Sequence, residues 1–275
     1  MGDLDLLVPK GRLNQAVAAV EALGYVPEGP EIKPGLARLI SYEVNFDGGE
    51  YIPLHVELHW NLIGGEANRY RPRIVWFWEQ AEMANLSDVQ AMVLKPTAHL
   101  LYMAAHLALK HGEANSPLRW FYDIHLLVEQ EGQRIQWDEL VARAREFGWA
   151  PALHVALAGT VARFATPLQI GLLESLVNVG DPRDQALIRR KTRSQTRWES
   201  TVDSLASLSW RARLHLLMAL AIPSPAYMRW RYKPRPSWLW PLYYPYRWFD
   251  ILRGGLSTLW KMASSRWLIA ANGRS

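Results

Sequence analysis

The sequence predicts an α+β protein in which a small mixed or antiparallel sheet comes first and a mostly α-helical region follows. Residues 3–8 alternate polar and apolar side chains before becoming apolar, as a strand emerging from a core does, and the alternation recurs within 51–60. From residue 96 onward, apolar residues recur at helical spacing. The composition (275 residues, 49% hydrophobic, 21% charged, no Cys) is that of a globular protein, and it excludes disulfides, cysteine-ligated zinc and thiol catalysis.

The first part of the chain has the predicted order strand, helix, strand, strand. The segments are a strand at 3–8, a helix at 14–23, a loop rich in Pro, Gly and Glu at 27–34, and strands at 38–46 and 51–60. Gly24 is typical of the residue that follows a helix. Asp47-Gly48-Gly49 lies between the last two strands and predicts a hairpin turn.

The rest of the chain has helical periodicity. We expect helices at 96–110, 118–129, 138–147, 150–164, 168–176, 184–193 and 201–221. Pro117 favours the start of the second helix, and Gly148 separates the third from the fourth. The chain therefore divides into a sheet unit at 1–75, a helical region at 76–222 and a C-terminal segment at 223–275.

The C-terminal segment is basic and aromatic. It carries nine Lys and Arg residues against one acid, Asp250, and six of the 14 Trp residues. Its charge is thus +8, and because the whole chain is +5, the other residues together carry −3. Such a segment suits packing against the helical region, contact with an anionic membrane surface through residues 234–275, or nucleic-acid binding, and we favour them in that order.

The sequence also predicts the compartment. Asp3 and Asp5 lie where a signal peptide would have a basic region. The longest stretch without a charged residue, 214–228, contains His215 and two prolines and is too interrupted for a spanning helix. We therefore expect a cytoplasmic protein that contacts membranes, if at all, peripherally.

Three carboxylates fall on one face of the predicted sheet. Asp3 and Asp5 lie two residues apart on the first strand, so their side chains leave the same face. Glu57 joins them if the strand at 51–60 is a neighbour. Such oxygen ligands suit hard divalent cations, and two cations can clamp the attacking and leaving oxygens of a phosphoryl transfer. The alternative is a solvated sheet edge with capping aspartates.

Other polar residues lie close to these acids in the predicted sheet. His55 and His59 share the face of Glu57. Each would be a ligand, a proton shuttle or an orienting partner, or else a half-buried strand histidine. Lys10, after the first strand, would contact phosphate or be a solvated loop charge. His99 and His106 lack the His-x-x-x-His spacing of helix-borne zinc sites, so we do not predict zinc there.

Six short motifs occur in order along the chain. The first three are Gly2-Asp3-Leu4-Asp5-Leu6-Leu7-Val8, Ala22-Leu23-Gly24-Tyr25 and Val56-Glu57-Leu58-His59-Trp60. The others are His99-Leu100-Leu101 through His106 to Lys110-His111-Gly112, then Leu118-Arg119-Trp120 with Asp123, then Ile222-Pro223-Ser224-Pro225 leading to Arg231-Tyr232. In this order they resemble the uncharacterised nucleotidyltransferase family of the DNA polymerase beta-like superfamily.

The resemblance implies transfer of a nucleoside monophosphate from a nucleoside triphosphate such as ATP, with Mg²⁺ or Mn²⁺, to an unidentified acceptor. Carried over by position, Asp3 and Asp5 would bind metal, and Glu57 would be the third acid of the superfamily pattern. A second group would bind nucleotide or acceptor from a cleft facing the sheet: His106, Lys110, His111 and Arg119. Arg119 and Asp123 also have the spacing of an ordinary surface ion pair on a helix.

The superfamily normally places a Gly-Ser or Gly-Gly turn upstream of the first aspartate to cradle the triphosphate. Here Gly2-Asp3 follows Met1 directly. We therefore expect either a start farther upstream or a shortened derivative. The sequence predicts a Mg²⁺-dependent nucleotidyltransferase; the alternative is a catalytically degenerate member that acts as a membrane-peripheral or partner-binding protein.

Overall fold

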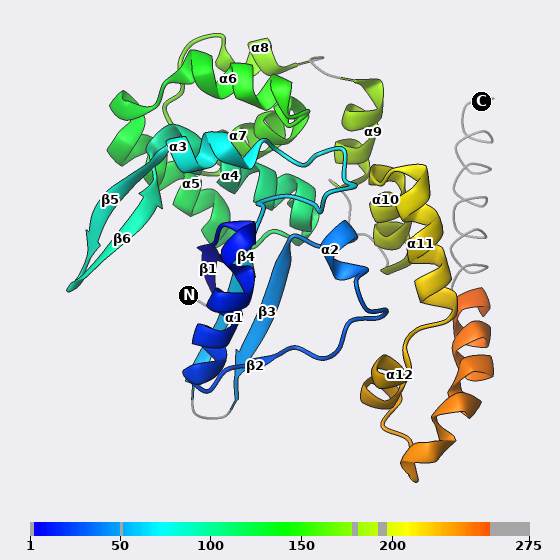
Figure 1. The fold of residues 1–275 in the computed structure, drawn as a ribbon. Helices are drawn as coiled ribbons and strands as arrows, with labels where there is room; N and C mark the ends of the chain where they lie inside the picture. Colours follow the sequence, from blue (N-terminus) through cyan, green and yellow to red (C-terminus); the bar gives the residue numbers. More distant parts are fainter. Residues whose placement is uncertain (1–2, 50–51, 178–180, 192–196, 254–275) are drawn as a thin grey trace, which may run out of the picture. The chain divides into compact units, whose positions relative to one another are not determined.

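The computed structural model describes residues 3–49, 52–177, 181–191 and 197–253 (Figure 1). They form two compact units that alternate along the chain. The sheet unit contains the described residues of 1–59, 65–68 and 195–275, and the helical unit contains those of 60–64 and 69–194. The three segments expected from the sequence (1–75, 76–222 and 223–275) remain a prediction.

The sheet unit contains a four-stranded mixed sheet, which confirms the predicted fold class. Its strands are β1 (Asp3–Leu7), β2 (Val26–Pro27), β3 (Glu43–Gly48) and β4 (Ile52–His59), in the spatial order β1-β4-β3-β2. β1 runs parallel to β4, whereas β3 is antiparallel to both of its neighbours. The strands predicted at 3–8 and 51–60 are therefore neighbours, as the carboxylate hypothesis requires.

A helix covers one face of this sheet. After the 3₁₀ turn η1 (Lys10–Arg12), α1 (Leu13–Ala22) confirms the helix predicted at 14–23. The core between helix and sheet consists of four buried apolar residues, Val20, Phe46, Val56 and Leu58. Because side chains alternate along a strand, this apolar core leaves the polar residues of β3 and β4 on the opposite face.

The strand predicted at 38–46 is wrong in its first half. Residues 37–40 form the short helix α2 (Ala37–Ile40), and β3 begins only at Glu43. Leu36 is buried in a cluster with Leu208, Ala212, Leu216 and Ala219, against which Leu39 and Ile40 also pack. Apolar residues at 36, 39 and 40 lie on one side of a helical turn, so tertiary packing overrides the extended conformation expected from composition.

The last described elements also belong to the sheet unit. They are α10 (Arg197–Ser207), α11 (Trp210–Ala221), α12 (Pro225–Tyr232), the 3₁₀ segment η5 (Ser237–Leu242) and the helical residues 243–253. The prediction of one helix at 201–221 is wrong, because the helix is interrupted between the end of α10 and the start of α11. There Leu208 forms an isolated bridge with Asn68, and the N–H of Ser209 donates to the carbonyl of Ala67 at 3.1 Å.

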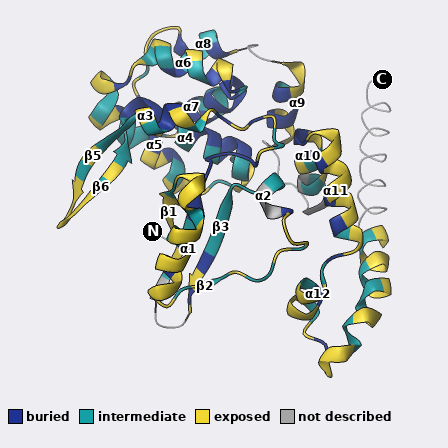
Figure 2. Ribbon diagram, in the orientation of Figure 1, coloured by how far each residue is buried: buried dark blue, intermediate teal, exposed yellow. Residues whose placement is uncertain are grey.

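The helical unit contains most of the helices that the sequence predicts. They are α4 (Pro96–Ala105), α5 (Leu118–Glu131), α6 (Trp137–Glu146), α7 (Ala150–Phe164), α8 (Leu172–Leu176) and α9 (Pro182–Lys191), and α3 (Ile74–Glu79) is a helix that was not predicted. A π-helical segment, η2 (His106–His111), extends α4, and 3₁₀ turns occur at η3 (Glu113–Asn115) and η4 (Gly132–Arg134). Its buried residues gather where α4, α5 and α7 pack together (Figure 2). Among the helices of the described chain, none is both long enough and apolar enough to cross a membrane.

The sequence prediction misses a β-hairpin in the helical unit. Strands β5 (Ala81–Leu86) and β6 (Val89–Leu94) pair antiparallel, with Leu86 opposite Val89. The turn between them is Ser87-Asp88, and Ser87 has a φ of 53°. The sequences that most strongly predict a hairpin turn are Asn-Gly and Asp-Gly, because Gly adopts positive φ easily. The Ser-Asp pair does not predict this turn.

Candidate functional site

The parallel pairing of β1 and β4 aligns the polar residues of the two strands. Asp3 lies opposite His55, and Asp5 lies opposite Glu57. Residues directly opposite each other in neighbouring strands project from the same face of the sheet. The carboxylates of Asp5 and Glu57 therefore come together on the face opposite α1.

Strand β3 adds two more polar residues to this face. Its antiparallel register with β4 places Glu43 opposite His59 and Asn45 opposite Glu57. The alternating residues Val44 and Phe46 point toward α1 and its core. The site face is thus lined by three adjacent strands, with β4 in the middle.

His59 is at the centre of the acidic group. Its side chain is only 1% exposed, and its Nε2 lies 3.5 Å from Asp5 Oδ1 and 3.2 Å from Glu57 Oε2. On the other side of the ring, Nδ1 lies 3.5 Å from Glu43 Oε2. One donor atom each from Asp5, Glu57 and His59 lie within 4.8 Å of one another. Three atoms this close can share one metal ion.

Several buried atoms of this face lack hydrogen-bond partners among the described residues. They are both ring nitrogens of His59 and the Oδ1 of Asn45. The carboxylates near His59 lie within ion-pair distance but outside hydrogen-bond geometry. Because buried polar atoms nearly always have a partner, the face suits a further bound group. Carboxylate oxygens suit Mg²⁺ or Mn²⁺ and imidazole suits transition ions, so these residues fit a divalent cation.

The electrostatics of the face favour positive charge. Burial alone would lower the pKa of His59, but Asp5 and Glu57, followed by Glu43, raise it to about 9. Burial, followed by the negative charges of Glu43 and Glu57, raises the pKa of Tyr42 well above its usual range. The three carboxylates leave a net negative charge even when His59 is protonated, which attracts a cation.

The raised pKa of His59 predicts that the metal-free protein is less stable in alkaline solution. The folded-state pKa of about 9 lies above the unfolded value of about 6.5. Protonated His59 therefore stabilises the fold fully below about pH 6.5, and this contribution is lost as the pH rises through about 9. We expect a loss on the order of a few kcal/mol, measured by urea unfolding in EDTA at pH 6.5, 8 and 9.5.

The matched control for this experiment is a pair of single variants on the same strand. His59→Gln should flatten the pH dependence, whereas His55→Gln, which changes an exposed residue on the same face, should leave it intact. An equally steep alkaline loss in His59→Gln would assign the effect to another group.

The other predicted residues of the sheet unit lie around the cluster rather than in it. Asp3 is exposed on β1 and is not part of the three-residue group. His55 is also exposed, with its Nδ1 3.8 Å from Glu28 Oε1. Lys10, at the start of η1, forms an ion pair with Glu66. These positions suit contact with a ligand at the rim of the site, which remains a prediction.

The remaining predicted residues belong to the helical unit and form a group of their own. His106, Lys110 and His111 lie in the π-helical segment η2, and Arg119 is exposed on α5. The i to i+5 spacing brings the rings of His106 and His111 to 4.7 Å, and Trp120 lies 5.3 and 4.6 Å from them. π-Helical turns often occur at functional sites. That this group binds nucleotide or acceptor remains a prediction.

Sequence reasoning missed Glu43 and Asn45. Their signal was present, since residues 43–46 read Glu-Val-Asn-Phe and alternate polar with apolar side chains. Composition places this segment in a strand but does not show which of its residues share the face of Glu57. Pairing the two strands across the hairpin turn places Asn45 beside Glu57 and Glu43 beside His59.

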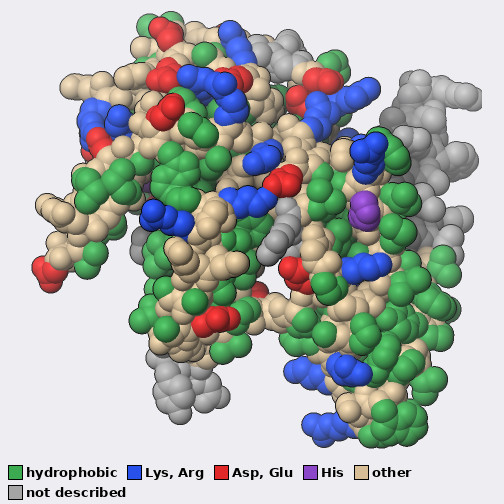
Figure 3. All heavy atoms as spheres, in the orientation of Figure 1, with side chains coloured by type: hydrophobic (Ala, Val, Ile, Leu, Met, Phe, Trp, Pro, Cys, Tyr) green, Lys and Arg blue, Asp and Glu red, His purple; other side chains and the backbone are tan. Residues whose placement is uncertain are grey.

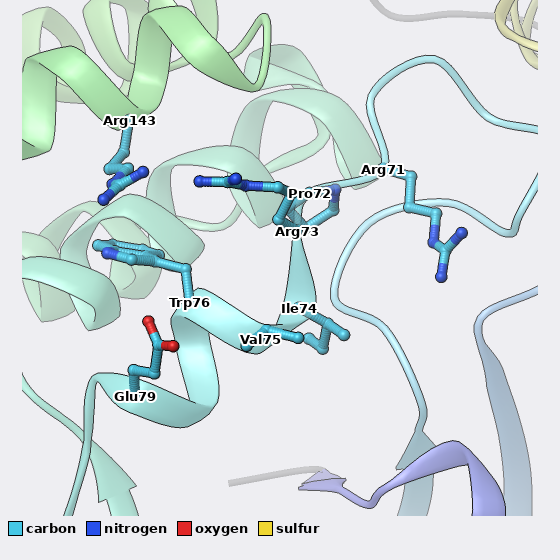
Figure 4. A pocket seen from close by; sticks show the side chains of 8 residues that line it. All are labelled: Arg71, Pro72, Arg73, Ile74, Val75, Trp76, Glu79 and Arg143. Atoms are coloured by element: carbon cyan, nitrogen blue, oxygen red, sulfur yellow. The ribbon is translucent and has the colours of Figure 1, made fainter.

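A separate pocket of about 570 Å³ lies in the helical unit (Figure 4). Three arginines line it together with Trp76: Arg71, Arg73 and Arg143. Glu146 pairs with Arg73 at 2.9 Å and with Arg143 at 2.7 Å, and Trp76 donates to Glu139 at 3.0 Å. These carboxylates offset most of the positive charge, so the pocket does not resemble an anion site.

Comparison with known proteins supports one relationship. The family model described as uncharacterised nucleotidyltransferase matches residues 1–165. The matched stretch contains β1, β3 and β4, and therefore Asp5, Glu43, Glu57 and His59. The resemblance noted at 222–232 lies beyond this stretch and remains a prediction. Neither the curated proteins nor the solved structures contain a match to the chain.

Proposed function

Because the chain belongs to the uncharacterised nucleotidyltransferase family, we propose that it transfers a nucleoside monophosphate from a nucleoside triphosphate to an acceptor. The observation that carries the proposal is the convergence of donor atoms from Asp5, Glu57 and His59 within 4.8 Å. The family match supports the class of reaction, and the cluster supports the position of the site on the sheet.

In the proposed site, Asp5 and Glu57 hold Mg²⁺ or Mn²⁺ through their carboxylate oxygens, and Asp3 adds a carboxylate at the exposed rim. When bound, a divalent cation neutralises the phosphates and stabilises the charge that develops on them. The acceptor oxygen forms a bond to the α-phosphorus, and the bond to the departing pyrophosphate breaks. Glu57 accepts the proton of an acceptor hydroxyl.

His59 acts as a positioning residue in this proposal. It lies beneath both carboxylates, 3.5 Å from Asp5 and 3.2 Å from Glu57, and Glu43 holds the far side of its ring at 3.5 Å. A buried positive ring with a third carboxylate on its far side attracts both carboxylates and restricts where they can move. Preorganised ligands lose less free energy when they bind a cation and the charged transition state.

The remaining predicted residues are proposed to recognise the nucleotide or acceptor. Lys10 and His55 flank the carboxylates in the sheet unit. The group in the helical unit, His106, Lys110, His111 and Arg119, combines cations for phosphate with two imidazole rings whose centroids lie 4.7 Å apart. Aromatic rings can stack on a base, and Lys and Arg bind phosphate.

The proposal is tested by incubating the full chain with each α-phosphate-labelled nucleoside triphosphate in Mg²⁺ or Mn²⁺. We expect release of pyrophosphate and transfer of label to protein, nucleic acid or a small molecule from a cell extract, both abolished by EDTA. Mn²⁺ binding is measured in parallel by electron paramagnetic resonance. Metal and nucleotide binding without any transfer would favour the degenerate alternative, and the absence of both would contradict the proposed site.

A further inference from the structure

The helix formed by residues 243–253 has an inner face that is fixed to the sheet unit. Three side chains donate hydrogen bonds to backbone carbonyls: Tyr244 to Pro223 at 2.6 Å, Arg247 to Leu220 at 2.9 Å and Trp248 to Ala221 at 2.7 Å. The acceptors lie at the end of α11 or just after it, where helix carbonyls lack intrahelical donors. The orientation of the helix is therefore well defined.

The outer face of the same segment is apolar and exposed. Leu242, Tyr246 and Phe249 follow one another at helical spacing and are 68, 59 and 65% exposed. Trp238, in the preceding turn η5, is 70% exposed. An exposed apolar stripe of this kind marks an interaction surface, because a monomer gains nothing from leaving it in water.

Cations lie next to this stripe, because Tyr232, between Arg231 and Lys233, has its ring 6.0 Å from that of Tyr246. Between residues 223 and 253 the chain has six basic residues, Arg229, Arg231, Lys233, Arg235, Arg247 and Arg253, and a single acid, Asp250. All but Arg247 are exposed. Figure 3 shows basic and hydrophobic side chains side by side over this part of the surface. The surface therefore attracts a partner that is both anionic and apolar.

We propose that the outer face of residues 237–253, together with the adjacent basic residues of 229–235, docks on the surface of an anionic lipid bilayer. Trp and Tyr side chains favour the headgroup level, Leu and Phe favour the acyl boundary, and basic residues pair with anionic headgroups. A nucleic acid would match the charge and could stack on the aromatic rings, but it offers no apolar layer for Leu242 and Leu252, which is 64% exposed. A bilayer therefore matches both the apolar stripe and the neighbouring cations.

The test is flotation of the full chain with vesicles of phosphatidylcholine alone or with phosphatidylserine added. We expect binding to the anionic vesicles that weakens in high salt. Arg231→Ala/Lys233→Ala should lower partitioning about 25-fold, about five-fold for each cation. Leu242→Ala/Phe249→Ala should lower it about ten-fold, because less apolar surface enters the bilayer.

Matched controls lie elsewhere on the surface. Lys33→Ala/Arg71→Ala removes two exposed cations and Leu23→Ala/Ile170→Ala removes two exposed apolar side chains. Both should float like the unmodified chain, and all variants should keep its circular dichroism spectrum. Equal binding by the stripe variants and the controls, or binding to a single-stranded oligonucleotide with none to vesicles, would overturn the proposal.

Discussion

Replacing Asp5 with Asn is expected to lower nucleotidyl transfer at least about 100-fold. Loss of groups that merely support a metal ligand costs about 10- to 100-fold, so loss of a proposed ligand should cost no less. The amide keeps the shape of the side chain but loses its charge, and it leaves Glu57 and His59 in place. The measurement is the initial rate of pyrophosphate release together with the Kd for Mn²⁺.

Two further single variants show whether a loss of activity is specific to Asp5. Asp47→Asn changes an exposed residue of β3 whose Oδ1 accepts a hydrogen bond from the N–H of Gly49, which Asn can also do. It should retain full activity. Asp3→Asn reports whether the rim carboxylate of β1 is needed as well. An Asp5→Asn enzyme with unchanged rate and unchanged Mn²⁺ affinity would remove Asp5 from the proposed site.

Replacing His59 with Ala is expected to destabilise the metal-free protein by about 2–4 kcal/mol at pH 7. The substitution removes a buried positive charge and leaves Asp5, Glu43 and Glu57 facing one another without a countercharge. We expect a smaller loss of stability than when a fully buried ion pair loses one partner, because the side chains of Asp5 and Glu57 are 34% and 18% exposed. Urea unfolding in EDTA measures it.

The His59→Ala variant also tests whether a cation binds beside the carboxylates. Mg²⁺ or Mn²⁺ should restore part of the lost stability of His59→Ala, since a bound cation replaces the missing charge. His55→Ala is the matched control, because it lies on the same strand and face but is exposed. Identical losses in the two variants, or a loss in His59→Ala that cations leave unchanged, would argue against an electrostatic role for His59.

The central part of the site could be predicted from sequence because it depends on a local pattern. Asp3 to Leu6 and His55 to His59 alternate polar and apolar residues, so each strand reveals which side chains share a face. Strand adjacency then places Asp5 beside Glu57. The burial of His59 could not be predicted in this way, since it requires β1, β3 and β4 to converge on one ring.

The errors in the fold prediction have the same origin. The short helix α2 and the break between α10 and α11 depend on contacts with residues distant in sequence, such as Leu36 with Leu208 and Asn68 with Leu208. The hairpin β5–β6 depends on a turn that Ser87 forms at positive φ. Local propensity carries little information about either kind of feature, whereas long periodic helices such as α7 are specified locally.

The position of β1 at the edge of the sheet has a dynamic consequence. In the described chain β1 pairs with β4 alone, and Leu4 and Leu6 are 42 and 38% exposed, so little free energy holds this strand in place. A local opening of β1 would separate Asp5 from Glu57 while the rest of the fold persists. A cation bound to both Asp5 and Glu57 would then hold β1 against β4. Amide hydrogen exchange in β1 should therefore be slower in the metal-bound protein than in the metal-free protein.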